Sequence, residues 1–163
     1  MPTKSLKIIV RRARSSDKLS VMLMLSKTNS FRPNELQIAE EVFDDAIANG
    51  PKGDYQSFVA KEKRNAVAWL CFGPTPCTLS TFDIYWLVVH PQNQNRGVGS
   101  FLMQYAESLI KKRSGRMIVV DTSGSPRYLL ARRFYENIGY RRAARLKNFY
   151  APGDDKIIYV KYL

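Results

Sequence analysis

The sequence predicts an α/β fold in which one sheet of about seven strands carries helices on both faces. Short runs rich in β-branched and aromatic residues alternate with stretches of helical apolar spacing. Glycine and proline pairs separate these elements. Neither a repeat nor a linker divides the 163 residues. We therefore expect a single domain over residues 1–163, with the element order β-α-α-β-β-β-α-β-α-β-β.

The N-terminal part supplies one strand and two helices. β-Branched residues predict a strand over 6–12. Asp17 can cap or charge the start of the first helix. The second helix opens at Asn34 and ends at the Gly50-Pro51 pair, a common helix stop. The apolar residues that mark these two helices are Leu19, Met22, Leu23 and Met24, then Leu36, Ala39, Phe43, Ala46 and Ile47.

The middle of the chain supplies three strands and a helix. Segments 55–61 and 66–72 predict two strands joined by a polar turn. Segment 81–89 is nearly all apolar or aromatic, which predicts a central strand. A helix follows over 97–112 and stops at Ser114-Gly115. Its predicted buried stripe is Val98, Phe101, Leu102, Tyr105 and Leu109.

The C-terminal part supplies three strands and the last helix. The short apolar run 117–120 predicts a central, parallel strand. Pro126 suits the first turn of a helix, and Gly139 suits the left-handed position that ends one. Segments 140–149 and 156–162 predict two final strands around a polar turn. The predicted buried stripe of the helix is Leu130, Phe134 and Ile138.

The net charge of the chain suggests an anionic binding partner but does not identify which kind. Twenty-six Lys and Arg against fourteen Asp and Glu give a net charge of +12. Nucleic acid, an anionic membrane, a phosphorylated small molecule or simply a solvated basic surface would explain it. A nucleic-acid-binding module rests on charge alone, since no RNP-like, zinc-finger or recognition-helix pattern accompanies it. We expect no membrane partner, because the uncharged apolar runs 21–25 and 84–89 are too short to span a bilayer.

Cysteine and histidine usage narrows the chemistry. Cys71 and Cys77 have neither the spacing of a disulfide framework nor that of a zinc site. Without a signal-peptide pattern, a reducing compartment is the default, and we expect a cytoplasmic protein. The single histidine, His90, excludes a multi-histidine metal site, so we expect no metal. For His90 itself, a solvated or loop-packed role is favoured over a catalytic one.

The most informative stretch runs from Asp83 to Ser100. An apolar strand passes through a polar loop into Gly97-Val98-Gly99 and then a helix. Amides at a helix start have no internal partners, and with the helix dipole they form an anion site. A dinucleotide fingerprint fails because Leu102 stands where a third glycine is needed, and no P-loop pattern is present. The alternative is a glycine pair that only makes a tight strand-to-helix turn.

At this point the sequence resembles the GNAT superfamily of acyl-CoA-dependent N-acetyltransferases. The family signature of Gln or Arg, two residues, Gly, one residue, and Gly or Ala is matched by 94–99, after a strand ending in Val88-Val89. A second family signature is similar to 131–140, Ala-Arg-Arg-Phe-Tyr-Glu-Asn-Ile-Gly-Tyr. The element order is also the family's. The resemblance therefore covers nearly the whole chain and implies a mixed, mostly antiparallel, twisted sheet.

The resemblance implies transfer of an acetyl group from acetyl-CoA to a primary amine. The pyrophosphate of CoA would lie on the backbone amides of 94–100. The pantetheine arm would pair with the open edge of the central strand at Leu87, Val88 and Val89. The residues that would form the cofactor site are Leu87, Val88, Val89, Gln94, Asn95, Arg96, Gly97, Val98, Gly99, Ser100 and Tyr135.

The resemblance also implies two catalytic residues. Tyr135 would protonate the departing CoA thiolate, which a phenol with a pKa of about 10 can do; the alternative is a tyrosine that only packs. Asp83 would take a proton from the amine, often through water. Its usual pKa of about 3.9 makes it a weak base unless burial raises that pKa; the alternative is a strand cap or an ion pair with Arg. The amine would attack the thioester directly.

The acceptor side is the least defined. By resemblance, the residues that flank it are Phe31, Tyr85 and Tyr150, together with Phe149. The acidic residues within 35–45 could attract a cationic amine, although a solvated helix face explains them as well. Arg132 and Arg133, or the basic run 111–113, could bind the 3′-phosphate, with solvated charge as the alternative. A CoA-binding protein of this fold with another acyl donor, or without catalysis, stays open, as does a homodimer.

Overall fold

The computed structural model describes residues 7–28 and 30–163, which form seven strands and four α-helices in the predicted order. The strands are β1 (Ile8–Arg12), β2 (Gln56–Glu62), β3 (Asn65–Pro74), β4 (Thr81–Val89), β5 (Met117–Ser123), β6 (Arg141–Ala151) and β7 (Asp154–Tyr162). The helices are α1 (Lys18–Lys27), α2 (Pro33–Asn49), α3 (Val98–Lys112) and α4 (Leu129–Asn137). Leu6, the first residue of the predicted first strand, lies outside the described residues.

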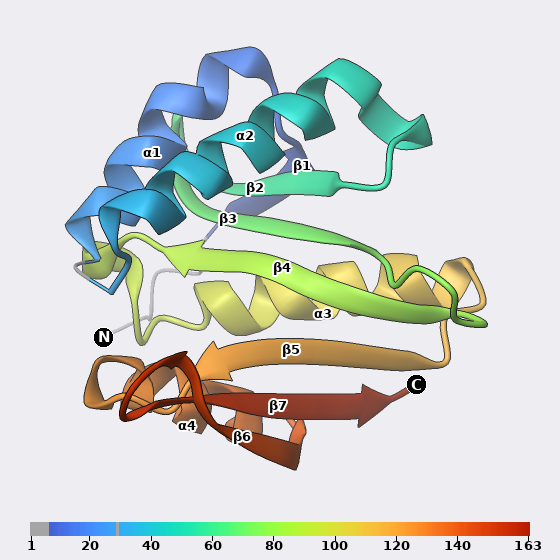
Figure 1. Ribbon diagram of the computed structural model, residues 1–163. Helices are drawn as coiled ribbons and strands as arrows, with labels where there is room; N and C mark the ends of the chain where they lie inside the picture. Colours follow the sequence, from blue (N-terminus) through green and yellow to red (C-terminus); the bar gives the residue numbers. More distant parts are fainter. Residues whose placement is uncertain (1–6, 29) are drawn as a thin grey trace, which may run out of the picture. The chain divides into compact units, whose positions relative to one another are not determined.

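The sheet is mixed and mostly antiparallel, as predicted. Its hydrogen-bonded order is β1-β2-β3-β4-β5-β7-β6 (Figure 1). β1 with β2, β2 with β3, β5 with β7 and β6 with β7 pair antiparallel. β4 and β5 pair parallel, which confirms the expectation that 117–120 forms a parallel strand. No helix in the described part of the chain is long and apolar enough to cross a membrane.

The chain divides into two compact units that are described in turn. The first unit comprises Met1–Phe72 and Trp86–Ala106. The second unit comprises Gly73–Tyr85 and Glu107–Leu163. Strand β4 and helix α3 therefore contribute residues to both units.

The first unit has helices on both faces of its strands. α1 and α2 bury one side, where Phe43 of α2 packs against Trp69 of β3 with ring centroids 5.9 Å apart. The indole N–H of Trp69 donates to Ser57 Oγ at 2.8 Å, so its polar end is satisfied in the core. On the other side, Tyr105 of α3 meets Phe58 of β2 edge to face at 5.5 Å. Because strand side chains alternate between the two faces, neighbouring residues of β2 and β3 can pack on opposite layers.

The buried residues of α1 are not the full set of apolar residues that marked it, and the predicted buried stripe of α3 is partly wrong. In α1 the core residues are Val21, Met24 and Leu25, whereas Leu19 is 71% exposed. Asp17 precedes α1 without capping it, because its carboxylate accepts from the Arg11 guanidinium at 2.7 and 2.9 Å. In α3, Phe101 is 46% exposed; the buried residues of this helix that the prediction omitted are Met103, Ala106 and Ile110. The α2 stripe is confirmed, since Ala39, Phe43 and Ala46 are buried.

In the second unit, the predicted stripe of α4 is wrong. Tyr135 is the buried residue of this helix, at 7% exposure, and Leu130 is 72% exposed. The reason is geometric: Leu130 and Tyr135 are five positions apart, which places them about 140° apart around the helix. Since the Tyr135 ring packs against Tyr140 and Tyr159, each 6.0 Å away between centroids, Leu130 must face outward.

Candidate functional site

The loop between β4 and α3 has the geometry of an anion cradle. After Val89, a single 3₁₀ turn (Pro91–Asn93) leads to Asn95, which has a φ of 59°, and to Gly97, which has a φ of 79°. Phe101 N donates to Gly97 O at 3.0 Å, the first bond of the α3 ladder. The amides of 98–100 precede that bond, so they have no helical acceptor. Their N–H groups and the positive end of the α3 dipole favour a negative charge here.

Gly97 is required by its backbone conformation. A φ of 79° lies in the left-handed region, which costs an L-residue about 1–2 kcal/mol. A Cβ atom built at Gly97 would meet nothing within 4 Å. Glycine is therefore not needed here to avoid a clash with the protein; it permits the turn and leaves the space beside the loop open.

Side chains of the predicted cofactor loop anchor the loop itself. Arg96 forms an ion pair with Glu62 at the end of β2, with Nη2 and Oε1 3.0 Å apart. Asn93 Nδ2 donates to the same carboxylate at 3.0 Å. Gln94 Nε2 donates to Val89 O at 3.2 Å, and Gln94 N donates to Pro91 O at 3.4 Å. The backbone N–H of Gln94 thus donates within the turn, whereas we expected it to face the cofactor.

The end of β4 lies beyond its pairing with β5. The parallel register joins Thr81 to Met117 and ends with Ile84 and Val120. Val88 is buried in the core of the first unit, and Leu87 and Val89 are half-buried. His90 N donates to Val67 O at 2.8 Å, and His90 Nδ1 accepts from Gln92 N, so this histidine is packed in the loop as expected. Leu87, Val88 and Val89 thus have no partner on β5 in this register, and their pairing with an extended ligand stays a prediction.

Tyr135 lies in an aromatic cluster of the second unit. Burial raises the pKa of its hydroxyl, which keeps the group protonated at neutral pH. The hydroxyl has no hydrogen-bond partner within the described residues. Every fully buried side-chain nitrogen or oxygen atom in that part of the chain does have a partner, so the Tyr135 hydroxyl oxygen is not completely shielded from solvent. A protonated phenol can donate a proton to a group bound beside it.

Asp83 is half-buried and belongs to a row of charged groups that crosses three strands. Its Oδ2 accepts from Thr75 Oγ1 at 2.6 Å. Burial is the main cause that raises the pKa of Asp83; Asp121 raises it further, while Thr75 and Lys156 lower it. Lys156 Nζ lies 2.6 Å from Asp121 Oδ2 on the neighbouring strand. A carboxylate whose pKa is raised is a better base than an ordinary aspartate.

Asp83 and Tyr135 lie on opposite faces of the second unit's strands. Asp83 pairs with Val119 of β5, and the next residue, Val120, pairs with Tyr159 of β7. Paired residues share a face and consecutive residues alternate. Because Tyr135 packs on Tyr159, it lies on the face away from Asp83. The two groups could therefore act on opposite sides of a reacting centre but cannot exchange a proton directly.

The predicted acceptor residues fall in both units. Tyr85 in the second unit is 36% exposed, and its hydroxyl donates to Pro74 O at 3.5 Å. Tyr150 packs edge to face against Phe149, at 5.0 Å, and both are exposed. Phe31 in the first unit packs on Trp86, 5.6 Å away. The second unit thus presents an exposed aromatic pair, and Lys156 Nζ stands 4.4 Å from the centre of the Phe149 ring.

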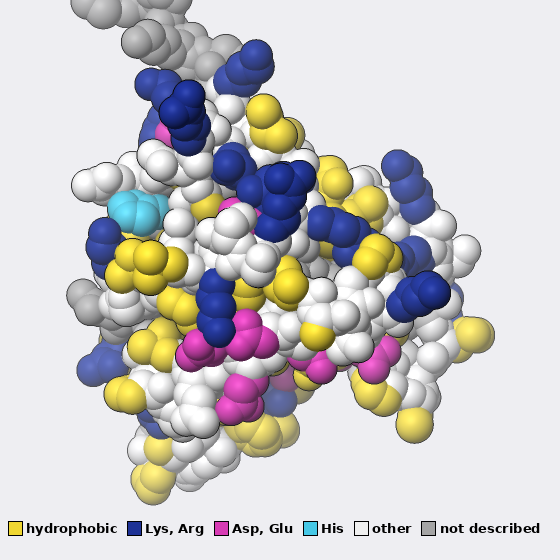
Figure 2. Space-filling model, turned by 90° about the horizontal axis from the view of Figure 1, so that it is seen from above, with side chains coloured by type: hydrophobic (Ala, Val, Ile, Leu, Met, Phe, Trp, Pro, Cys, Tyr) yellow, Lys and Arg dark blue, Asp and Glu magenta, His cyan; other side chains and the backbone are white. Residues whose placement is uncertain are grey.

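The acidic residues of α2 form a solvated, paired face. Lys18 Nζ lies 2.9 Å from Glu40 Oε1 and 2.8 Å from Asp44 Oδ2. On the face in Figure 2, acidic side chains gather in a patch with Lys and Arg side chains around it. This favours the solvated-face alternative for these acids. Cys71 is buried, in line with a core role, and burial raises the pKa of its thiol.

Asp121, Lys156 and Glu62 were missed by the sequence analysis. Asp121 carried a usable signal, because it continues the apolar strand Met-Ile-Val-Val and alternation places it on the same side as Val119. Glu62 had no such signal, since a glutamate at the end of a strand is ordinary. Its partner Arg96 is 34 residues away in the chain.

The fold and the two glycine-containing signatures define a class of protein, and comparison with known proteins agrees. A family profile described as an acetyltransferase (GNAT) domain matches residues 53–142. The chain belongs to the GNAT acetyltransferase family. A GNAT-family protein from Desulfovibrio desulfuricans is 36% identical, with a TM-score of 0.90 over 95% of this chain and 98% of the other.

More distant solved structures share the fold. The ribosomal-protein-alanine N-acetyltransferase from Escherichia coli is 18% identical, with a TM-score of 0.76 over 95% of this chain and 93% of the other. The protein yncA from Salmonella typhimurium, solved with its cofactor acetyl-CoA, is 14% identical, with a TM-score of 0.74 over 96% of this chain and 94% of the other. No curated protein matches the sequence.

Proposed function

We propose that residues 1–163 form one N-acetyltransferase domain that transfers the acetyl group of acetyl-CoA directly to a primary amine. The single observation that carries this proposal is the turn at Gly97. Its left-handed backbone opens α3 with amides that have no helical acceptor, beside space that no protein atom fills. A pyrophosphate supplies the negative charge that such amides favour. Membership of the GNAT family supports the same donor.

The chain's own groups fit an extended acyl-CoA. The amides of 98–100 would hold the pyrophosphate, while Glu62 fixes the loop through Arg96. Leu87, Val88 and Val89 would offer backbone groups to the pantetheine arm, because they lie beyond the pairing of β4 with β5. The pantetheine arm would run along β4 and the pyrophosphate would lie at the start of α3. These two contacts together would position the thioester. Positioning of this kind supplies much of the rate in acyl transfer.

The proposed reaction needs one base and one acid. The amine nitrogen attacks the thioester carbonyl, a C–N bond forms, and the C–S bond breaks. The proton of the amine passes to Asp83, directly or through water, and its raised pKa suits it to that role. The departing thiolate takes the proton of Tyr135, whose raised pKa keeps it in the acid form. Their placement on opposite faces separates the acid from the base.

The acceptor face we propose lies in the second unit. Asp83 and Asp121 would attract an ammonium group, and the exposed ring of Tyr150 would contact the carbon skeleton beside it. Lys156, held by Asp121, already shows that an ammonium group can sit between a carboxylate and the Phe149 ring. These contacts favour a cationic amine with an apolar body.

Two measurements test the proposal. Calorimetric titration with acetyl-CoA should show saturable binding, and a panel of primary amines should release free thiol with at least one member. Saturable CoA binding without thiol release from any amine would favour a CoA-binding protein with another acyl donor or no catalysis. Absence of binding at 1 mM acetyl-CoA, about −4 kcal/mol, would remove both, leaving the nucleic-acid alternative that the net charge of +12 alone supports.

A further inference from the structure

A polar pocket opens in the second unit, and neither proposed catalytic residue, Asp83 or Tyr135, lines it. It has a volume of about 210 Å³. Arg132 and Glu136 of α4, Arg142 and Arg145 of β6, and Tyr159 of β7 line it. Three guanidinium groups from two elements thus converge on one small space. That space is smaller than the pockets that take drug-sized ligands, about 300–1,000 Å³.

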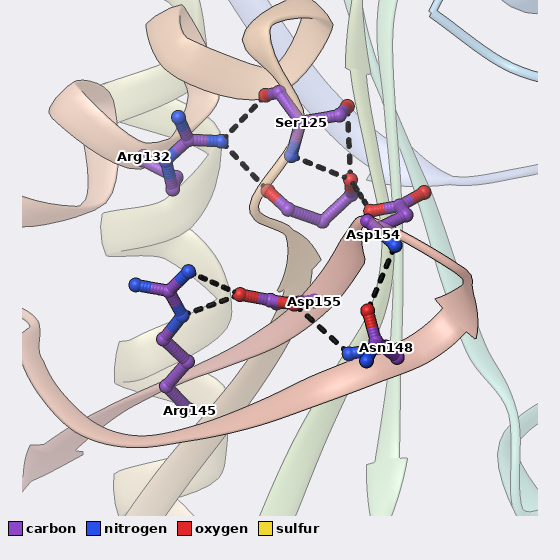
Figure 3. Close-up of polar contacts among 8 residues, drawn as sticks. Ser125, Arg132, Arg145, Asn148, Asp154 and Asp155 are labelled. Carbon is purple, nitrogen blue, oxygen red and sulfur yellow. Dashed lines mark hydrogen bonds and ion pairs between the residues drawn. The ribbon is translucent and has the colours of Figure 1, made fainter.

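Two of the three guanidinium groups are fixed in place. Arg132 Nη1 donates to Ser123 O at 2.7 Å and to Ser125 O at 2.8 Å. Arg145 forms an ion pair with Asp155 through Nε and Nη2. Figure 3 shows both guanidinium groups on the same side of Asp155. Because a guanidinium carries five N–H donors, each of these arginines keeps donors for a further acceptor.

Asp155 makes the arrangement rigid. It is 7% exposed, and its Oδ1 accepts from Asn148 N at 2.9 Å. The hydrogen bonds from Asn148 N and the Arg145 side chain hold the pKa of this carboxyl below its usual range, so it stays charged. The arginine is therefore oriented before any ligand arrives. Such pre-organisation reduces the entropy lost on binding.

Arg142 is the third cation and the one without a counter-charge. It makes no hydrogen bond or ion pair within the described part of the chain. The Glu136 carboxylate is engaged by the Tyr159 hydroxyl, which donates to Oε1 at 2.9 Å. Against three guanidinium groups, Glu136 and Asp155 leave one positive charge unbalanced. The guanidinium groups therefore repel one another. An anion that accepted hydrogen bonds from Arg142 and its neighbours would offset this repulsion.

We propose that this pocket, which we call the arginine pocket (Arg132, Arg142 and Arg145), binds a phosphate group. A tetrahedral oxyanion accepts from several planar guanidinium forks at once, and charge-assisted bonds of this kind are about twice as strong as neutral ones. The volume admits an inorganic phosphate or the phosphoryl end of a small molecule. No residue of the pocket serves as acid or base in the proposed acetyl transfer. Arg132 is also a candidate for the 3′-phosphate of CoA, so the test includes competition with CoA.

The test is a calorimetric titration of the full chain with inorganic phosphate at constant ionic strength. We expect saturable binding that Arg142→Gln weakens by about tenfold or more, the loss of a hydrogen bond to a charged group. Arg141→Gln is the matched control. It changes the same charge on the same strand, but it pairs with Val160 and therefore faces away from the pocket. Its affinity for phosphate should equal that of the unchanged chain.

Three outcomes would overturn the proposal. Equal weakening by Arg141→Gln and Arg142→Gln would show a general effect of surface charge. Equal affinity for succinate would show that the pocket does not select a tetrahedral oxyanion. Loss of phosphate binding when the chain is saturated with CoA would assign the anion site to the cofactor. Phosphate binding that survives saturating CoA supports a separate site, and it does so whether or not any amine is acetylated.

Discussion

Substituting Gly97 by Ala tests the turn that carries the proposed function. The left-handed φ of 79° should cost an L-alanine about 1–2 kcal/mol of folding free energy. For a chain of this size, each kcal/mol lowers the Tm by about 2–4 °C. The added methyl group would also stand in the open space beside the loop, since no protein atom lies within 4 Å of it. We expect the Kd for acetyl-CoA to rise by about tenfold or more, which is about 1.4 kcal/mol.

Gly153 provides a matched control for Gly97. It has a φ of 81°, and a Cβ atom there also meets nothing within 4 Å. It lies in the turn between β6 and β7, away from the residues of the cofactor loop in sequence. Gly153→Ala should therefore lower the Tm as much as Gly97→Ala while leaving the Kd for acetyl-CoA unchanged. Calorimetry and thermal unfolding measure the two quantities. If both variants lose stability equally and neither loses affinity, the loop does not bind the pyrophosphate.

Four further variants probe the chemistry and the stability. Tyr135→Phe keeps the ring but removes the hydroxyl, so kcat should fall about a hundredfold while acetyl-CoA affinity holds; full turnover would refute the acid role. Lys156 lowers the pKa of Asp83 and Asp121 raises it, so Lys156→Met should move the rising limb of the pH–rate profile to higher pH and Asp121→Asn to lower pH. Shifts in the same direction, or none, would place the base elsewhere. For Asp17, burial opposes the charge, but bonds from Arg11 and Arg14 lower its pKa overall. Its contribution is therefore present above the unfolded pKa of about 3.9 and lost as pH falls through the lower folded value. Urea denaturation should show Asp17→Asn about 1–3 kcal/mol less stable at pH 7, with the difference shrinking towards pH 2; an equal difference at both pH values would contradict the linkage.

Most of the architecture could be predicted because each helix or strand is indicated by the pattern of residues within its own segment. β4 has the predicted limits, Thr81–Val89, since a continuous apolar run carries its own signal. The start of α3 is also predictable from neighbouring residues, because Gly97, directly before the helix, marks the turn into it. The faces of short helices are less certain. In α4 only nine residues set the stripe, and the contacts of Tyr135 with β7 decide which side is buried.

The catalytic candidates could be located by resemblance, but their surroundings could not. The contact of Asp121 with Lys156 depends on the pairing of β5 with β7, which lie more than thirty residues apart in the chain. The arginine pocket likewise requires α4 and the β6–β7 hairpin to be in place. Sequence motifs report residues that act through nearby backbone, such as Gly97. They do not report side chains that come into contact only through the pairing of strands distant in the sequence.

The last strand in the sheet order, β6, has a consequence for the behaviour of many copies of the chain in solution. An outermost strand offers a free row of peptide groups on which a second molecule could add itself. On β6 that row is accompanied by Arg141, Arg142, Arg145 and Lys147. Two molecules approaching edge to edge would bring like charges together, and this repulsion discourages self-association. Because dissolved salt screens this repulsion, self-association of the chain should increase with ionic strength.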